Sequence, residues 1–351
     1  MALPLALVIA LALAWSGYWW FMFSKAKEEF GRWQAHAEDA GVTLGCGSQG
    51  WGGYPFRVEM DCEPLELSWS SRDGTSEIRL AGLQTVSQVY DPQHVLAAGA
   101  SPAAMRSLDP GAGEPSFALA ATYDPATASV RFDRHRPDRL SLVVEALRAD
   151  ITERKHDGAG DARVTNISAD SFDLHFRFVD PPRDGRAQLE LASDGSAVRA
   201  EGRGLVSALG EPLDLDRFEL RARADRVPYP IDNPDVALRG FAADGGTLTV
   251  DRLLAKSGPV SFVARGTLAL DKRGRATGDL TAEVVNMKGL LSKFERAGKI
   301  GRTEAQLAAG LLSFLEGATT GDKGAISVDM RVKKGKIYFG PFKVAEIPPL
   351  F

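Results

Sequence analysis

The chain has 351 residues, of which 44% are hydrophobic and 25% charged. This composition is typical of a globular protein with one large domain or two smaller ones. The formal net charge of −4 gives no basic surface of the kind that attracts nucleic acid, so we expect no nucleic-acid partner.

The N-terminal stretch, residues 1–23, carries no charged side chain. As an α-helix, residues 2–23 would extend about 33 Å at ~1.5 Å per residue, which matches a hydrocarbon core of ~30 Å. We therefore predict that residues 1–23 are an uncleaved transmembrane anchor. A cleaved signal peptide and a buried core helix are the alternatives. The first would lack a basic residue before its candidate cleavage site at residues 12–14, and the second is disfavoured by an apolar surface on all sides.

Helical spacing continues beyond the predicted anchor. Phe30, Trp33 and Ala37 recur at three- and four-residue steps. Residues 24–41 are therefore predicted to form a helical stalk, which ends at Gly41.

The orientation of the anchor is indicated by two opposing signals. Lys25, Lys27 and Arg32 follow the anchor and favour a cytoplasmic C-terminal side. Cys46 and Cys62, close together behind a membrane-targeting segment, instead favour an oxidising compartment such as a bacterial periplasm. We predict a disulfide between them, which closes a loop of about fifteen residues and contributes ~3 kcal/mol. Two unpaired buried thiols are the alternative.

From residue 42 onward, apolar and polar residues alternate, as in strands with one apolar and one polar face. Two of the clearest runs place on one face Phe56, Val58 and Met60, and Phe172, Leu174, Phe176 and Phe178. Loosely repeated hairpins follow, of which residues 266–285 are the most informative. The predicted fold is mainly β: an antiparallel, elongated and curved sheet behind an N-terminal transmembrane helix. We place this β-rich domain, residues 42–351, in the periplasm.

One helical insertion, at about residues 287–317, interrupts the strands. Helical spacing covers residues 290–297, and Thr303 with Gln306 forms a capping box at the start of a second helix. The expected result is a C-terminal helical hairpin that packs on the apolar face of the sheet. A mobile lid or a membrane-contacting element is the alternative.

Signals of catalysis are few. The histidines form no metal-binding pair; they are His36, His94, His135, His156 and His175. A serine-nucleophile elbow and a phosphate-binding loop are also missing from the sequence. His175 and Asp173 share one strand face, but such pairs are far more often solvated surface than an acid–base site. We therefore predict no enzymatic activity, no cofactor and no metal.

Several segments resemble a known family. The aromatic-rich anchor, the Trp-containing helix and then GYPFR (residues 53–57) leading to a cysteine resemble a bacterial envelope family catalogued as domain of unknown function 2125. VYDPQHVLA (residues 89–97) and KIYFGPFKVAEIPPL (residues 336–350) also resemble it, so the likeness covers nearly the whole chain. It implies a protein anchored in the inner membrane, mainly of alphaproteobacteria, with no assigned activity and no catalytic residues to carry over.

The hairpins are similar, more distantly, to those of AsmA-like proteins. That resemblance implies an apolar groove along a long curved sheet and a role in lipid traffic. The candidate lipid-facing residues are Phe172, Leu174, Phe176, Phe178, Leu189 and Leu268. The alternative is an envelope scaffold or interaction module in which the same residues form a closed core. Alternation is identical in the two cases, so lipid and envelope proteins both remain candidate partners beside the inner membrane.

Overall fold

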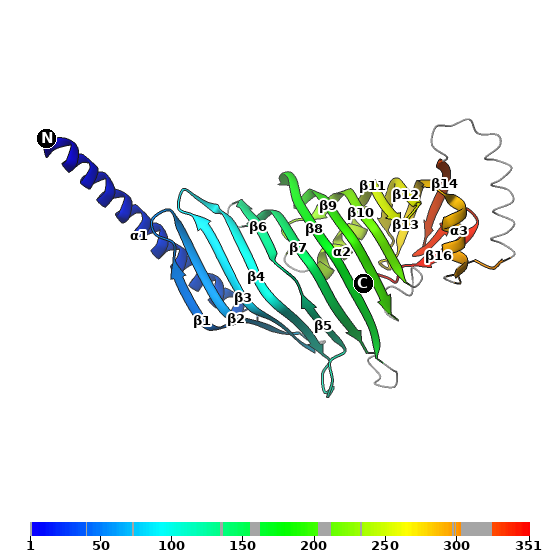
Figure 1. Cartoon of the computed structure of the whole chain (residues 1–351), viewed down its shortest axis with the longest axis horizontal. Helices are drawn as coiled ribbons and strands as arrows, with labels where there is room; N and C mark the ends of the chain where they lie inside the picture. The colour runs from blue at the N-terminus through cyan, green and yellow to red at the C-terminus, as the bar shows by residue number, and fades with distance from the viewer. Residues whose placement is uncertain are drawn as a thin grey trace. The chain divides into compact units, whose positions relative to one another are not determined.

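A computed structural model of the chain describes residues 2–39, 41–71, 74–133, 136–154, 162–202, 212–231, 234–296, 298, 300–302 and 325–351. In these residues the fold is mainly antiparallel β, preceded by one long apolar helix, which confirms the predicted fold class (Figure 1). The chain divides into two compact units, Met1–Ala162 (unit 1) and Arg163–Phe351 (unit 2).

The N-terminal helix α1 (Ala2–Asp39) is continuous, so the predicted anchor and stalk form a single helix. Its apolar part is long and apolar enough to cross a membrane, by length and composition. Gly41 follows at φ +79°, and its N–H donates to the Glu38 carbonyl at 2.9 Å. Because glycine adopts this left-handed conformation at little cost, it ends the helix where the sequence predicts.

Unit 1 continues with seven strands: β1 (Val42–Gly52), β2 (Arg57–Ser71), β3 (Gly74–Gln88), β4 (Asp91–Leu108), β5 (Phe117–Thr122), β6 (Ala126–Asp133) and β7 (Arg136–Glu153). β1 to β4 pair in chain order, and β5 and β6 each pair with both β4 and β7. The buried side chains of β2 include Val58 and Met60. Phe56 does not share their environment, contrary to the alternating pattern: it lies in the turn before β2 and is exposed.

The two cysteines form a disulfide between β1 and β2, as predicted. Their Cα atoms are 5.3 Å apart, and Cys62 has no exposed surface. In the ladder Cys46 lies opposite Leu65 and Cys62 opposite Gln49, so the bridge joins positions that are not paired directly. It ties the first strand of the sheet to the second.

In the described ranges of unit 2, nine strands follow: β8 (Arg163–Arg183), β9 (Arg186–Gly202), β10 (Leu213–Pro228), β11 (Thr247–Ser257), β12 (Val260–Leu270), β13 (Ala276–Val285), β14 (Ala325–Lys333), β15 (Lys336–Phe339) and β16 (Phe342–Glu346). Each pairs antiparallel with the next in chain order. The hairpin that the sequence predicts over residues 266–285 is the β12–β13 pair, with a turn that begins at Asp271.

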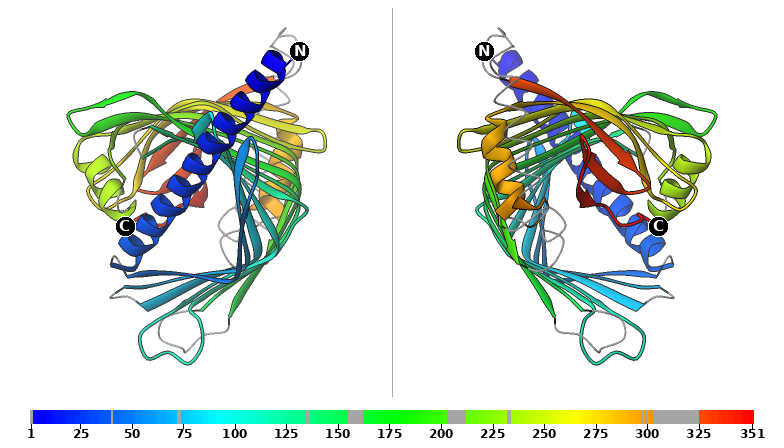
Figure 2. Two further views of the ribbon diagram at one scale, coloured as in Figure 1. Left: turned by 90° about the vertical axis from the view of Figure 1, so that its left-hand side faces the viewer. Right: turned by 90° about the vertical axis from the view of Figure 1, so that its right-hand side faces the viewer.

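The described residues of unit 2 also include the helices α2 and α3. α3 (Met287–Arg296) is the first helix of the predicted hairpin, and it lies beside β12 (Figure 2). The predicted second helix, at residues 303–317, lies outside the described residues. α2 (Pro234–Ala243) was not predicted, although Pro234 at its first position is a recognised helix-start signal.

Candidate functional site

The candidate lipid-facing residues of β8 lie on one face of the unit 2 sheet. Phe172, Leu174, Phe176 and Phe178 are separated by two positions, and successive side chains of a strand point to opposite faces. Each of the four is half-buried. The ring of Phe178 also contacts that of Tyr229 edge-on, with centroids 4.8 Å apart.

The strand register carries this surface across the rest of the unit. Leu189 lies opposite Phe178 on β8 and opposite Ala224 on β10. Leu248 of β11 lies opposite Ala224 in turn, and Leu268 of β12 lies opposite Leu248. Phe178 and Leu268 are therefore members of one row, four inter-strand steps apart, or about 19 Å at ~4.8 Å per step.

Three parallel rows lie beside the first. We call the four rows together the apolar face. In strand order from β8, the other three are Phe176–Leu191–Ala222–Val250–Gly266–Leu280–Met330, Leu174–Ser193–Leu220–Leu253–Ala264–Ala282–Val328, and Phe172–Gly195–Phe218–Ala255–Phe262–Val284–Ile326. The register shift of β11 between Val250 and Leu253 keeps both residues in these rows. All six predicted residues are thus brought to one face.

One end of the apolar face is a closed core. Ala264, Ala282 and Val284 have no exposed surface, and Met287 and Leu291 of α3 pack in the same cluster. Further cluster members come from the last strands, among them Phe339 and Val344. The predicted packing of a helix on the apolar face is confirmed for α3, because its buried residues meet those of β12 and β13.

The other end is only partly covered. In the described part of the chain, Phe172, Leu174 and Phe176 belong to neither hydrophobic core cluster, and each keeps some exposed surface. The only polar side chain among the four rows at this end, that of Ser193, is buried and donates to the Asp173 carbonyl at 2.8 Å. Because its hydroxyl is hydrogen-bonded within the sheet, the surface of the apolar face at this end is made of nonpolar groups.

The opposite face of the unit 2 strands is covered with ion pairs. Arg177 donates to Glu190 at 2.6 Å, and Arg223 donates two hydrogen bonds to Asp251, at 3.0 and 2.7 Å. The Asp251 carboxylate raises the pKa of Arg223 above its ordinary value. Cross-strand pairs of this kind at an exposed surface contribute little each and mark the solvated side of a sheet. The strand pairs therefore separate a charged face from an apolar one.

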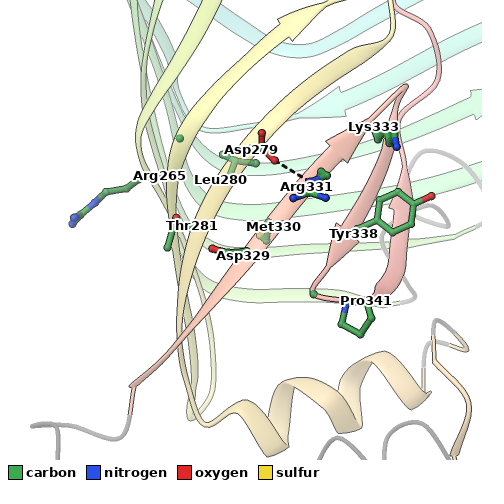
Figure 3. A pocket seen from close by; sticks show the side chains of 12 residues that line it. Arg265, Asp279, Leu280, Thr281, Asp329, Met330, Arg331, Lys333, Tyr338 and Pro341 are labelled. Atoms are coloured by element: carbon green, nitrogen blue, oxygen red, sulfur yellow. Dashed lines mark hydrogen bonds and ion pairs between the residues drawn. The ribbon is translucent and has the colours of Figure 1, made fainter.

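A pocket of about 710 Å³ is found over β12 to β15 (Figure 3). Its polar residues include Asp279 and Arg331, which form an exposed ion pair at 3.1 Å, while Arg265 extends away from both. The remaining polar lining residues are Thr281, Asp329, Lys333 and Tyr338. Because these charges are paired with each other or directed to solvent, the pocket shows no convergent set of groups for catalysis.

The histidines are scattered. His36 contacts the Arg32 carbonyl on α1, and His94 contacts the Ser129 hydroxyl, both at 2.8 Å. His175 lies on β8, while His135 and His156 lie outside the described residues. Within the described ranges, no group of three or more His, Cys, Asp or Glu side chains is placed to hold a metal ion.

Comparison with protein families gives one match. The model of DUF2125, described as an uncharacterized protein conserved in bacteria, covers residues 19–348. No curated protein and no solved structure matches the chain. The match begins inside α1 and runs nearly to the C-terminus, so it includes both units. The chain belongs to the DUF2125 family of uncharacterized bacterial proteins.

Proposed function

We propose that the protein is anchored in the bacterial inner membrane by α1, holds residues 42–351 in the periplasm, and binds the acyl chains of lipids on the apolar face. The apolar length of α1 supports the anchor. The Cys46–Cys62 disulfide supports the compartment, since disulfides persist in oxidising environments. The distant resemblance of the hairpins to AsmA-like proteins agrees with a role in handling lipid.

The observation that carries the lipid proposal is that apolar residues line up in rows across the strands of unit 2, and that the residues at the β8 end of these rows are only half-buried. An acyl chain on this surface gains ~0.8 kcal/mol for each methylene fully removed from water. Contact on one side only removes about half of that surface, so ten methylenes would contribute about 4 kcal/mol. That is enough for reversible binding without an enclosed cavity. The expected ligand is a lipid tail, bound without a cofactor and without catalysis.

The second candidate function is an envelope scaffold in which the apolar face is closed. Two observations favour it: α3 already closes the face at β12 and β13, and Tyr229 covers the ring of Phe178. In that case a protein, or a further part of this chain, would cover β8 in the native state. The two functions differ in whether lipid reaches Phe172, Leu174 and Phe176.

Photoactivatable lipid tests the choice. The full chain is reconstituted in phosphatidylethanolamine–phosphatidylglycerol vesicles that contain a diazirine-labelled acyl chain, irradiated and digested. Adducts are then mapped by mass spectrometry. We expect adducts both on α1 and on the peptide that contains residues 172–178. Adducts on α1 alone would leave the anchor in place and refute lipid binding on the apolar face. A lack of adducts on α1 would refute the anchor.

A pair of variants controls for surface chemistry. Leu174→Asn places an amide on the apolar face, while His175→Asn places one on the opposite face of the same strand. We expect the first to reduce the adducts at residues 172–178 and the second to leave them unchanged. Equal effects of the two would show that the labelling is not specific to the apolar face.

A further inference from the structure

The helix α1 carries a stripe of side chains that packs on unit 1. Trp15, Trp19, Phe23, Lys27 and Phe30 recur at three- and four-residue steps, which places them on one side of a helix. Trp51 at the end of β1 receives three of them: it contacts the rings of Phe23 and Phe30, and the Lys27 ammonium lies 5.6 Å from its ring centroid.

The N-terminal part of the stripe packs against the turn between β1 and β2. The Trp15 indole lies 5.7 Å from the Phe56 ring, and the Trp19 indole 5.2 Å from the Tyr54 ring. The Tyr54 hydroxyl is also hydrogen-bonded to that of Ser16 at 2.9 Å. This turn is therefore fixed to the apolar part of α1 rather than to the stalk.

Side-chain donors of α1 bond to three backbone carbonyls in and beside the β1–β2 and β3–β4 turns. The indole N–H groups of Trp15 and Trp19 donate to Pro55 at 2.9 Å and to Arg57 at 2.8 Å. The Tyr18 hydroxyl donates to Val89 at 3.0 Å.

A further bond, from Val89 N–H to the Phe56 carbonyl at 3.1 Å, joins the β1–β2 turn to the β3–β4 turn. Irregular backbone is tolerated at membrane depth only where protein groups replace water as partners. The bonds described above give protein partners to the carbonyls of Pro55, Phe56, Arg57 and Val89.

The positions of these contacts along α1 determine the depth at which the two turns lie relative to the bilayer. Ala2 to Ala14, which precede the first contact, give about 20 Å of helix at ~1.5 Å per residue, short of a hydrocarbon core of ~30 Å. A membrane-spanning α1 must therefore bring the segment from Trp15 to Phe23 into the bilayer or its boundary as well. The turns fixed to Trp15, Tyr18 and Trp19 then lie at the same depth.

The aromatic side chains of these turns, and two on α1 beside them, keep large exposed surfaces. Tyr54, Phe56 and Tyr90 are 61%, 59% and 64% exposed, and Trp20 and Phe21 of α1 are 66% and 55% exposed at the same level. Aromatic residues gather at the boundary between headgroups and hydrocarbon. Exposed rings grouped on two turns and a helix match that boundary in chemistry.

We propose that the β1–β2 and β3–β4 turns are a second membrane-contacting element, which inserts Tyr54, Phe56 and Tyr90 into the headgroup boundary beside α1. This inference rests on the proposed anchoring by α1 and adds to it. Its consequence is that unit 1 is held against the bilayer at three places instead of being displayed at the end of a stalk. α1 is then partly a docking surface for its own sheet.

The test places a photoreactive side chain at single positions of the full chain in phosphatidylethanolamine–phosphatidylglycerol vesicles. Benzoylphenylalanine replaces Phe56 or Tyr90, and Phe21 serves as the reference for the anchor. Trp33, an exposed aromatic on the same helix about 21 Å beyond Trp19, is the matched control. Lipid adducts are measured by mass spectrometry. We expect them at positions 21, 56 and 90, and none at position 33.

The other outcomes separate the two proposals. Adducts at position 21 without adducts at 56 and 90 would overturn the second contact and keep the anchor. No adduct at position 21 would overturn the anchor, and with it the inference. Protein–protein adducts at 56 and 90 in place of lipid adducts would assign the turns to a partner or a second copy, and would overturn the membrane contact.

Discussion

Breaking the Cys46–Cys62 disulfide should loosen unit 1 and leave unit 2 unchanged. The bridge closes a loop with a sequence separation of 16, for which the chain-entropy model gives about 3 kcal/mol. Cys62 has no exposed surface, so reduction also leaves a thiol within the packed start of the sheet. Both effects act on β1 and β2, which the bridge joins.

Hydrogen exchange followed by mass spectrometry measures the change in each strand. Each 1.4 kcal/mol changes an equilibrium tenfold, so a loss of about 3 kcal/mol should raise the opening equilibrium of β1–β3 amides about a hundredfold. The chain has no other cysteine, so the amides of β12 and β13 are an internal control. A variant with Cys46→Ala and Cys62→Ala should behave as the reduced protein does.

Two results would refute this reasoning. Unchanged exchange in β1–β3 after complete reduction would mean that ladder and helix contacts alone hold the strands. An equal increase in β12 and β13 would mean that the bridge acts on the whole chain rather than on unit 1. Complete reduction is verified by alkylation of both thiols in the denatured protein.

Two further predictions concern unit 2. Val284→Ala should destabilise unit 2 by about 2–3 kcal/mol, because it removes two methyl-sized groups from a site with no exposed surface. Val285→Ala, on the other face of the same strand, should cost less than about 0.5 kcal/mol. Equal urea midpoints for the two variants would show that the core is not packed at Val284. At the β12–β13 turn, the Asp271 carboxylate accepts from Arg275, which lowers its pKa to about 2, below its usual 3.8. The stability that the ionised carboxylate contributes is therefore present above pH ~4 and lost as the pH falls toward 2. In urea unfolding, the loss of stability caused by Asp271→Asn should accordingly shrink between pH 5 and pH 2.5. A loss that stays constant over this range would refute the role of the charge.

The sequence predicted the elements better than it predicted their relations. Alternation is enough to find β8 and the β12–β13 hairpin, because it depends only on neighbouring residues. It does not give the register, since a shift by two residues preserves the pattern. For that reason the row that joins Phe178 to Leu268 could be recognised only from the strand pairs.

Phe56 illustrates a second limit of prediction from sequence, besides the strand register. Its spacing from Val58 places it on the buried face of a strand, yet it lies in a turn and is exposed beside Trp15. The competing cause is a tertiary contact with α1, far away in the sequence. The same holds for the aromatic residues of α1: their number predicts a membrane boundary, but their spacing of four, from Trp15 to Trp19 to Phe23, reflects packing on unit 1.

The half-open state of the apolar face could not be predicted either. Val284 and Phe176 follow the same alternation, but the first is covered by α3 and its neighbours, and the second is not part of either core cluster in the described chain. Coverage depends on where a helix lies across strands, which is a property of the assembled sheet. The lipid hypothesis therefore concerns one end of this face rather than all of it.

Lipid binding on the apolar face is tested most directly at two adjacent positions of β8. Benzoylphenylalanine is placed at Phe176, on the apolar face, or at Arg177, on the opposite face, and cells that make the full chain are irradiated. The mass of the crosslinked partner is then measured. We predict phospholipid adducts at position 176 and none at position 177. Protein adducts alone at 176, or lipid adducts of equal yield at both positions, would contradict lipid binding on the apolar face.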